Sequence, residues 1–271
     1  MDFLEIKNKR FAVFGVSNRR SIALAVARTI EEAGGQAIHV VRDAEIAAKA
    51  AALVGEAPVL TCDVSKETEI AALAGCMAER YAPLDGIVHS LAFAKYSEGF
   101  APFHQTARQD FLEAVDISCY SLIAIARHLL PCLSRQAAIV TLSISSTRTA
   151  AENYGYMGPV KAALDSSVAF LAKSLSRHGE IRVNAVGAGL LKTSASAGIP
   201  GYIDSYLFAE QVIPRKRNLT TQEVANTVVF LLSPRATGIN AQTIIVDAGM
   251  GINFFDRDLV TRVNRAEPAD G

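Results

Sequence analysis

Residues 11–27 read FAVFGVSNRRSIALAVA, and this stretch decides the fold class. The apolar run Phe11–Phe14 predicts a buried strand, the polar residues after Gly15 predict a turn, and the alanine-rich run after Ser21 predicts a helix. Gly15 can turn the chain tightly and Ser21 can cap the helix, so backbone N–H groups would point at a bound diphosphate. The three-glycine fingerprint of dinucleotide-binding turns is missing, so an ordinary strand–helix turn remains the alternative.

The same alternation of apolar strand and helix continues to the end of the chain. Six further apolar runs predict strands, at residues 37–41, 58–61, 86–89, 138–142, 181–186 and 242–246. Helices are predicted between them, including residues 69–81, 109–133, 162–177 and 221–232. This order predicts a single doubly wound, Rossmann-type α/β domain, with a seven-stranded parallel sheet and helices on both faces. Ligands of such sheets bind beyond the carboxyl ends of the strands.

Composition excludes several classes of function. The 271 residues suffice for one α/β domain with a large core, and half of them are apolar. Lysine plus arginine equals aspartate plus glutamate at 27 each, so no net field favours nucleic acid or a charged membrane. No run approaches the ~18 apolar residues of a membrane span, and the acidic start does not resemble a secretion signal. The four cysteines and five histidines show no metal-ligand spacing, so no metal is expected and a cytoplasmic location is predicted.

Tyr154 and Lys161 are the strongest candidates for catalysis. An ammonium near a phenol lowers the pKa of the phenol and lets it donate a proton to a carbonyl or enolate. On one helix their seven-residue separation is two turns with only ~20° of drift, whereas Tyr156 lies ~140° from Lys161. Pro159 belongs in a first helical turn, so a helix starting near Met157 would leave Tyr154 on the preceding turn. The alternative is an ordinary surface helix that happens to carry these residues.

The end of the second predicted strand bears on the cofactor. A dinucleotide fold meets the adenosine ribose here, where an acid favours NAD and an arginine favours the 2′-phosphate of NADP. Arg42 and Asp43 stand side by side at this point. Arg42 is therefore a candidate cofactor-binding residue, but the two side chains predict opposite preferences.

Taken together, these motifs resemble those of a known family. The chain is similar to the divergent short-chain dehydrogenase/reductases, and most similar to the bacterial enoyl-acyl-carrier-protein reductases of fatty-acid synthesis. The resemblance runs from about residue 11 to residue 252 and rests on residues 15–23, 62–64, 89–94, 116–121, 153–161, 182–185 and 191–193. Six residues separate the tyrosine from the lysine in this branch, whereas three separate them in ordinary short-chain reductases.

The resemblance implies a reaction and a role for each matched residue. A nicotinamide cofactor would deliver a hydride to the β-carbon of a trans-2-enoyl thioester. Tyr154 would bind the thioester carbonyl and help to protonate the enolate, and Lys161 would hold the nicotinamide ribose. The other implied contacts are the diphosphate (Gly15, Ser21, Ile22), the adenine (Asp63, Val64), the adenosine side (Leu91), the nicotinamide amide and phosphates (Leu191, Thr193, Ala195) and the substrate (Ala94).

Three further expectations come with the resemblance. The cofactor would be NADH, which the family commonly uses, or NADPH. The substrate would be carried by an acyl carrier protein, and the chain would form a homotetramer. For the side chains of Leu91, Leu191 and Ala94, core packing is the alternative to a binding role.

The chain departs from the family at three positions. Ile144 stands where the family often has a second tyrosine, Ala92 where it tends to have glycine, and Leu190 where it tends to have proline. These changes concern the substrate more than the cofactor.

Two segments beyond the motifs suggest how the substrate is reached. Residues 194–212 predict an apolar lid over an acyl chain, with a pair of surface helices as the alternative. Residues 215–217 are Arg-Lys-Arg, which suggests a docking rim for an acidic carrier or, alternatively, internal salt bridges. The reductase domain would span residues 1–255, and residues 256–271 would form a C-terminal tail.

Two other functions remain open at this point. Ser143 precedes Tyr156 by the thirteen residues usual in ordinary ketone and alcohol reductases, but Lys161 is then one position too far away. A non-catalytic dinucleotide-binding protein is the second alternative, although an intact Tyr154 and Lys161 argue against it.

Overall fold

Seven parallel strands form the centre of the molecule. The computed structural model describes residues 2–96, 99, 101–151, 154–193, 196 and 198–266. The strands are β1 (Arg10–Phe14), β2 (Gln36–Val41), β3 (Val59–Thr61), β4 (Leu84–His89), β5 (Leu133–Ile144), β6 (Arg182–Ala188) and β7 (Thr243–Val246). They lie in the order β3-β2-β1-β4-β5-β6-β7, and every neighbouring pair is parallel. The predicted seven-stranded Rossmann-type sheet is therefore confirmed, with its strand order reversing between β1 and β4.

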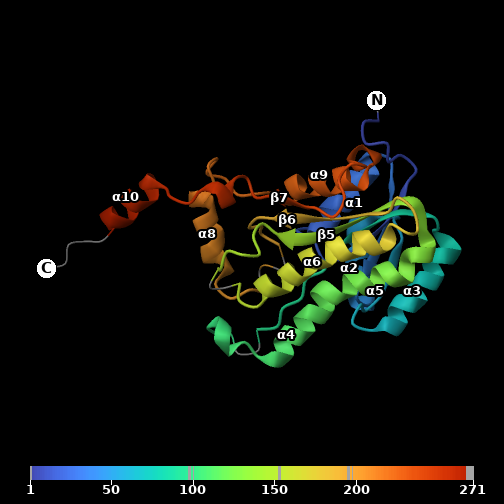
Figure 1. Cartoon of the computed structure of the whole chain (residues 1–271), viewed down its shortest axis with the longest axis horizontal. Coiled ribbons are helices and arrows are strands. Elements are labelled where there is room, and N and C mark those ends of the chain that lie inside the picture. The colour runs from blue at the N-terminus through green and yellow to red at the C-terminus, as the bar shows by residue number, and fades with distance from the viewer. Residues whose placement is uncertain are drawn as a thin grey trace.

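Helices cover both faces of the sheet, as Figure 1 shows. One face carries α1 (Ile22–Glu32), α2 (Ala44–Val54) and α9 (Thr221–Leu232). The other carries α3 (Glu67–Arg80), α4 (Arg108–Val115), α5 (Ser121–Leu129) and α6 (Met157–Leu175), with a π-helical turn at Asp116–Tyr120 between α4 and α5. Short 3₁₀ turns lie at Phe103–Gln105, Leu130–Cys132, Pro234–Ala236 and Met250–Ile252. Helices α8 (Tyr202–Val212) and α10 (Arg257–Ala266) lie to one side of the sheet, so part of the predicted tail is helical.

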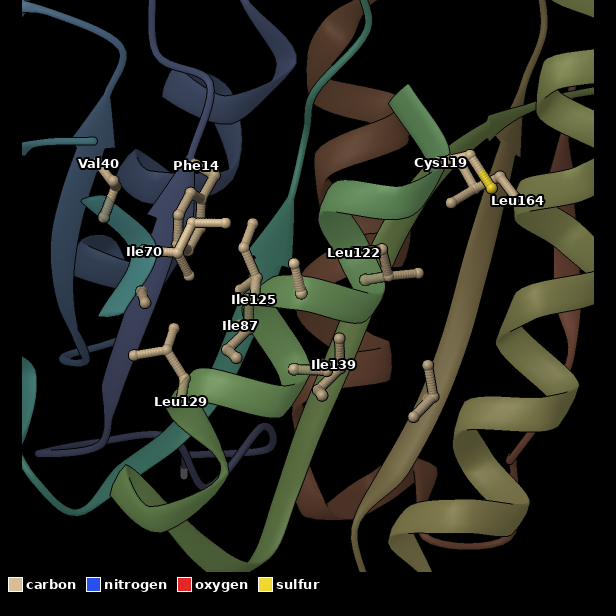
Figure 2. Close-up of a cluster of buried hydrophobic side chains, with 14 of the residues drawn as sticks. Phe14, Val40, Ile70, Ile87, Cys119, Leu122, Ile125, Leu129, Ile139 and Leu164 are labelled. Carbon is tan, nitrogen blue, oxygen red and sulfur yellow. The ribbon is translucent and has the colours of Figure 1, made fainter. Parts of the chain in front are cut away.

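Alternating strand residues build the two halves of the core. Ala12 and Phe14 of β1 face the cluster beneath α3, α5 and α6, whereas Phe11 and Val13 face the cluster beneath α1 and α9. Figure 2 shows the first cluster, in which side chains of α5 lie against side chains of the strands. Strands β1, β4 and β6 are buried on both faces, which explains their continuous apolar sequence, whereas the edge strands β3 and β7 each include an exposed residue.

The helical run Arg108–Cys132 is 25 residues long and, by length and composition alone, apolar enough to cross a membrane. The sequence did not predict such a segment. Half of its most apolar window is buried inside the protein, where α5 packs on α3 and on the sheet. This burial is typical of a core helix of a soluble domain.

Candidate active site

Tyr154 and Lys161 enter the site from two different elements. Helix α6 begins at Met157, with Tyr156 as its N-cap residue, so Lys161 is helical and Tyr154 lies on the turn before the helix. The prediction that both side chains share one helical face is therefore wrong, while the alternative start near Met157 is confirmed. Pro159 occupies the first turn of α6, where its missing N–H costs no helical hydrogen bond.

The Lys161 ammonium is buried at the carboxyl ends of β4 and β5. Its Nζ donates to the carbonyl oxygen of Leu142 at 2.7 Å and lies 3.5 Å from that of Leu91. Only 3% of the residue is exposed, and this burial lowers the pKa of the ammonium to about 8, against the opposing effects of Asp165 and Cys119. A cation held in this way, with two carbonyl partners, can still donate to a hydroxyl placed at the same edge.

The Tyr154 phenol is partly buried beside two other phenols. Burial raises its pKa, and the neighbouring Tyr96 and Tyr202 raise it further. The sequence predicted that Lys161 would lower this pKa, and in this conformation the direction is the opposite. The phenol therefore stays protonated at neutral pH, which is the state needed to donate a hydrogen bond to a substrate oxygen.

The Tyr156 side chain is already engaged by other parts of the chain. Its side chain is 5% exposed, and its hydroxyl donates to the carbonyl oxygen of Lys95 at 2.7 Å. The rings of Tyr96 and Phe111 pack on it, with centroids 5.4 and 6.4 Å away. Tyr156 is thus a packed structural residue, and the pairing of Tyr156 with Ser143 is not favoured.

The first strand–helix turn fits a diphosphate. Gly15 has φ +100°, and a Cβ at this position would lie 2.1 Å from the carbonyl oxygen of Ser90, so only glycine allows this approach of the two strand ends. Ser21 caps α1 by accepting from the Leu24 N–H at 3.4 Å, and its hydroxyl donates to the carbonyl of Asn18 at 2.9 Å. Ile22 is the first residue of α1, whose N–H groups and dipole face the end of β1.

Arg42 and Asp43 pair with each other after β2. The Arg42 Nε lies 2.9 Å from Asp43 Oδ2, while Asp43 Oδ1 accepts from the Ile46 N–H at 2.9 Å and caps α2. This capping bond, followed by the bond from Arg42, lowers the pKa of the Asp43 carboxyl. Asp43 thus has a structural role as the cap of α2, and its carboxylate also binds the Nε of Arg42.

The remaining predicted residues after β3 and β4 lie at the same edge of the sheet. Asp63 Oδ1 accepts from the Ser65 hydroxyl at 2.7 Å, and the Asp63 N–H donates to Glu69 at 2.8 Å, which fixes the turn after β3. Val64, Leu91 and Ala94 are partly buried against the core cluster, in agreement with the packing alternative for the side chains of Leu91 and Ala94.

The loop after β6 is held by residues that the sequence analysis missed. The Tyr202 hydroxyl accepts from the Leu191 N–H and donates to the Leu191 carbonyl, each at 2.9 Å. The Ser196 hydroxyl accepts from the Thr193 N–H at 2.9 Å. Leu191 and Thr193 are therefore engaged within the chain, whereas Ala195 lies outside the described residues. An aromatic residue eleven positions after Leu191 carries no periodic signal that could have revealed this contact.

A second missed network supports the loop after β4. His89 is fully buried, with Nε2 2.8 Å from the Ser121 hydroxyl and Nδ1 2.8 Å from the Thr141 hydroxyl. Burial, with Lys161 nearby, lowers its pKa to about 3, so the imidazole is neutral. Ser118, on the π-helical turn, binds the backbone of Phe93 through its hydroxyl, at 2.9 Å from the N–H and 3.2 Å from the carbonyl. Such π-turns often mark functional sites.

Two cations of the basic cluster after the predicted lid bind carboxylates of the same chain. Arg215 binds both carboxylate oxygens of Glu223, at 2.5 and 3.0 Å, and Lys216 lies 2.9 Å from Asp256. These contacts favour the salt-bridge alternative over a docking rim. Among the described residues, no cluster of three or more His, Cys, Asp or Glu side chains could hold a metal ion.

Comparison with known proteins identifies the family of this chain. Together, the sheet, the glycine turn and the tyrosine–lysine pair define a nicotinamide-dependent reductase of the short-chain type. The family model described as enoyl-(acyl carrier protein) reductase matches residues 15–251. The chain therefore belongs to the enoyl-(acyl carrier protein) reductase family, and the predicted family and class of reaction are confirmed.

Individual relatives cover nearly the whole chain. The NADH-dependent enoyl-[acyl-carrier-protein] reductase of Enterococcus faecalis is 35% identical over 246 residues, which is 90% of this chain and 98% of the relative. The NADPH-dependent enzyme of Staphylococcus aureus is 32% identical over 251 residues, 91% and 98% of the two chains. The crystal structure of the NADH enzyme of Aquifex aeolicus matches with a TM-score of 0.88 at 36% identity, over 93% of this chain and 99% of that one. The family thus includes users of each predicted cofactor.

Proposed function

We propose that this chain reduces the double bond of trans-2-enoyl thioesters presented by an acyl carrier protein, as a step of fatty-acid synthesis. The observation that carries the proposal is the buried Lys161 ammonium, fixed 2.7 Å from the Leu142 carbonyl near the end of β5, on the helix that directly follows the turn bearing Tyr154. A buried charge is expensive, so a fold retains one where it has a task.

Tyr154 is the acid in this proposal. Reduction at the β-carbon places negative charge on the thioester oxygen, and the protonated phenol stabilises that charge by donating a hydrogen bond to it. The phenol then gives its proton towards the enolate. The residue at the end of β5 is Ile144, which has no hydroxyl. Tyr154 is therefore the side chain that donates a hydrogen bond to the thioester oxygen.

The cofactor site is proposed along the carboxyl edge of the sheet. A reduced nicotinamide, when bound, supplies the hydride. Lys161 would hold the nicotinamide ribose hydroxyls, and Ala94 would contact the substrate through its backbone. The remaining proposed cofactor contacts are Gly15, Ser21 and Ile22 at the diphosphate, Asp63, Val64, Leu91 and Arg42 at the adenosine, and Leu191, Thr193 and Ala195 at the nicotinamide amide and phosphates.

Helix α8 is the proposed lid over the acyl chain. Its side chains reach the end of β6 through the Tyr202 hydroxyl at Leu191 and through the Tyr206 ring, whose centroid lies 4.3 Å from Lys192 Nζ. Helix α8 also exposes Ile203, Leu207 and Phe208, which is apolar surface available to a lipid chain.

Spectrophotometric oxidation of NADH and NADPH tests the reaction, with crotonyl thioesters of coenzyme A and of acyl carrier protein compared against a panel of ketones. Tyr154→Phe should lower the hydride-transfer rate at least ~10²-fold, as loss of a positioned acid does, and Tyr156→Phe should lower it less. Reduction of ketones but not of enoyl thioesters, or the reverse ranking of the two variants, would overturn the proposal.

Assembly and location complete the proposal. The chain is proposed to be a cytoplasmic homotetramer that binds neither nucleic acid nor membranes. The exposed Phe170 on α6 and the exposed Ile252, Phe254 and Phe255 after β7 support self-association, because they are apolar side chains that a partner subunit would cover. Light scattering of the purified protein measures the oligomeric state directly.

A further inference from the structure

Tyr154, the proposed acid, is not held by helix geometry. It lies three residues before α6, and the next residue, Gly155, has φ +52°. A Cβ placed on Gly155 would meet open space among the described residues. Among the described residues, the Tyr154 N–H donates to the Ala151 carbonyl at 3.0 Å, and the Tyr154 carbonyl accepts from the Met157 N–H at 3.3 Å. A turn of this kind needs other contacts to hold a side chain within the small positional error that catalysis tolerates.

Two tyrosine hydroxyls supply such contacts in a reciprocal arrangement. The Tyr156 hydroxyl, from the turn, donates to the carbonyl of Lys95 at 2.7 Å. The Tyr96 hydroxyl, from the segment after β4, donates to the carbonyl of Tyr154 at 3.3 Å. In each segment, a tyrosine hydroxyl thus donates a hydrogen bond to a backbone carbonyl of the other segment. The two tyrosine rings also pack together, with centroids 5.4 Å apart.

The contact is anchored at both ends. Tyr156 is 5% exposed and packs edge-on against Phe111 of α4. The segment after β4 is in turn fixed by Ser118, whose hydroxyl binds the Phe93 backbone. That segment also contains Ala94, the proposed substrate contact, so a shift of the Tyr154 backbone relative to this segment would break the contact.

We propose that Tyr96 and Tyr156 form a tyrosine clamp that positions the Tyr154 phenol against the segment that contacts the substrate. Both are positioning residues, because they act through Tyr154 and neither of them contacts a reacting atom of the substrate or the cofactor. The inference rests on the proposed role of Tyr154. It explains why this chain has aromatic residues at both positions, and it gives Tyr156 a task other than that of a second acid.

The test removes one hydroxyl at a time and retains each ring. Tyr96→Phe and Tyr156→Phe should each lower kcat about five- to tenfold, the effect expected when one hydrogen bond that orients a catalytic group is lost. Affinity for the dinucleotide, measured by fluorescence titration, should stay within about twofold, because Lys161 keeps its own contacts. Tyr120→Phe, a change at an exposed tyrosine on the neighbouring π-helical turn, is the matched control and should leave kcat unchanged.

A double-mutant cycle separates positioning from simple loss of stability. In a Tyr154→Phe background there is no phenol left to position, so adding Tyr96→Phe or Tyr156→Phe should have almost no further effect on the residual rate. An equal loss in both backgrounds, or wild-type kcat in both single variants, would overturn the clamp while leaving Tyr154 as the acid. Wild-type hydride transfer by Tyr154→Phe itself would instead refute the proposed function.

Discussion

Lys161 should weaken the fold at neutral pH, so replacing it should make the protein more stable and inactive. Its ammonium is buried, and its pKa falls from 10.5 in the free side chain to about 8. Methionine has a similar length, is apolar and adapts to irregular core space. Lys161→Met therefore removes the buried charge while keeping most of the packing.

The magnitude follows from the pKa. A fall from 10.5 to about 8 corresponds to a cost of about 3 kcal/mol at pH 7. The variant also loses the hydrogen bond to Leu142, which offsets about 1 kcal/mol of this gain in stability. Its free energy of unfolding should therefore rise by about 2 kcal/mol, or roughly 4 °C in Tm. The unfolded chain binds more protons than the folded one between pH 8 and 10.5, so the wild type gains stability as pH rises through this window. The advantage of the variant should thus vanish near pH 10.

Urea unfolding at pH 7 and pH 10, at one protein concentration, measures this difference. Lys173→Met, the same substitution at an exposed position of α6, is the control and should change stability by less than about 0.5 kcal/mol. Turnover and dinucleotide binding should be lost only in Lys161→Met. A Lys161→Met protein that is less stable than wild type at pH 7, or a stability difference independent of pH, would refute the reasoning.

Three further predictions concern the cofactor and the core. We expect NADH to be the better cofactor, because the Asp43 carboxylate would repel a 2′-phosphate and binds Arg42. A tenfold higher kcat/KM with NADPH would contradict this. It would mean that the attraction of Arg42 for the phosphate exceeds the repulsion by Asp43 by about 1.4 kcal/mol. The Tyr202 hydroxyl binds the N–H and the carbonyl oxygen of Leu191, a proposed cofactor contact. Tyr202→Phe should therefore tighten dinucleotide binding about fivefold in a fluorescence titration, and weaker binding would contradict this. His39 is buried without a hydrogen-bond partner for either nitrogen among the described residues, and burial lowers its pKa to about 4. The folded state therefore loses about 1 kcal/mol between pH 7.5 and 5.5, and thermal unfolding of His39→Leu should show a smaller loss over that range.

The strands were the most predictable part of this protein. Each apolar run became a strand within a few residues, because parallel strands covered on both faces need continuous apolar sequence. The largest error was the start of β5, at Leu133 instead of residue 138. Its first residues are mostly polar and exposed, so their pairing with β4 leaves no hydrophobic pattern.

Spacing proposed Tyr154 and Lys161 as the catalytic pair, but their geometry was not predictable. Helical periodicity placed Tyr154 on a helix that begins only at Met157. The direction of the Tyr154 pKa shift was likewise wrong, because it depends on burial beside Tyr96 and Tyr202. Those two residues come from other parts of the chain, and no local pattern reports them.

The sequence by itself determined the doubly wound sheet, the family and the class of reaction, and it proposed Tyr154 and Lys161 as the catalytic pair. These follow from patterns a few residues long, such as strand alternation, the glycine turn and the tyrosine–lysine spacing. Tertiary structure alone decided which partner each polar side chain takes. Arg215 binds Glu223, Tyr156 binds the Lys95 backbone and Tyr202 binds Leu191. Each such bond contributes only about 1 kcal/mol and often joins segments far apart in sequence, so it is set by the packing of the whole domain and leaves no periodic trace in the chain.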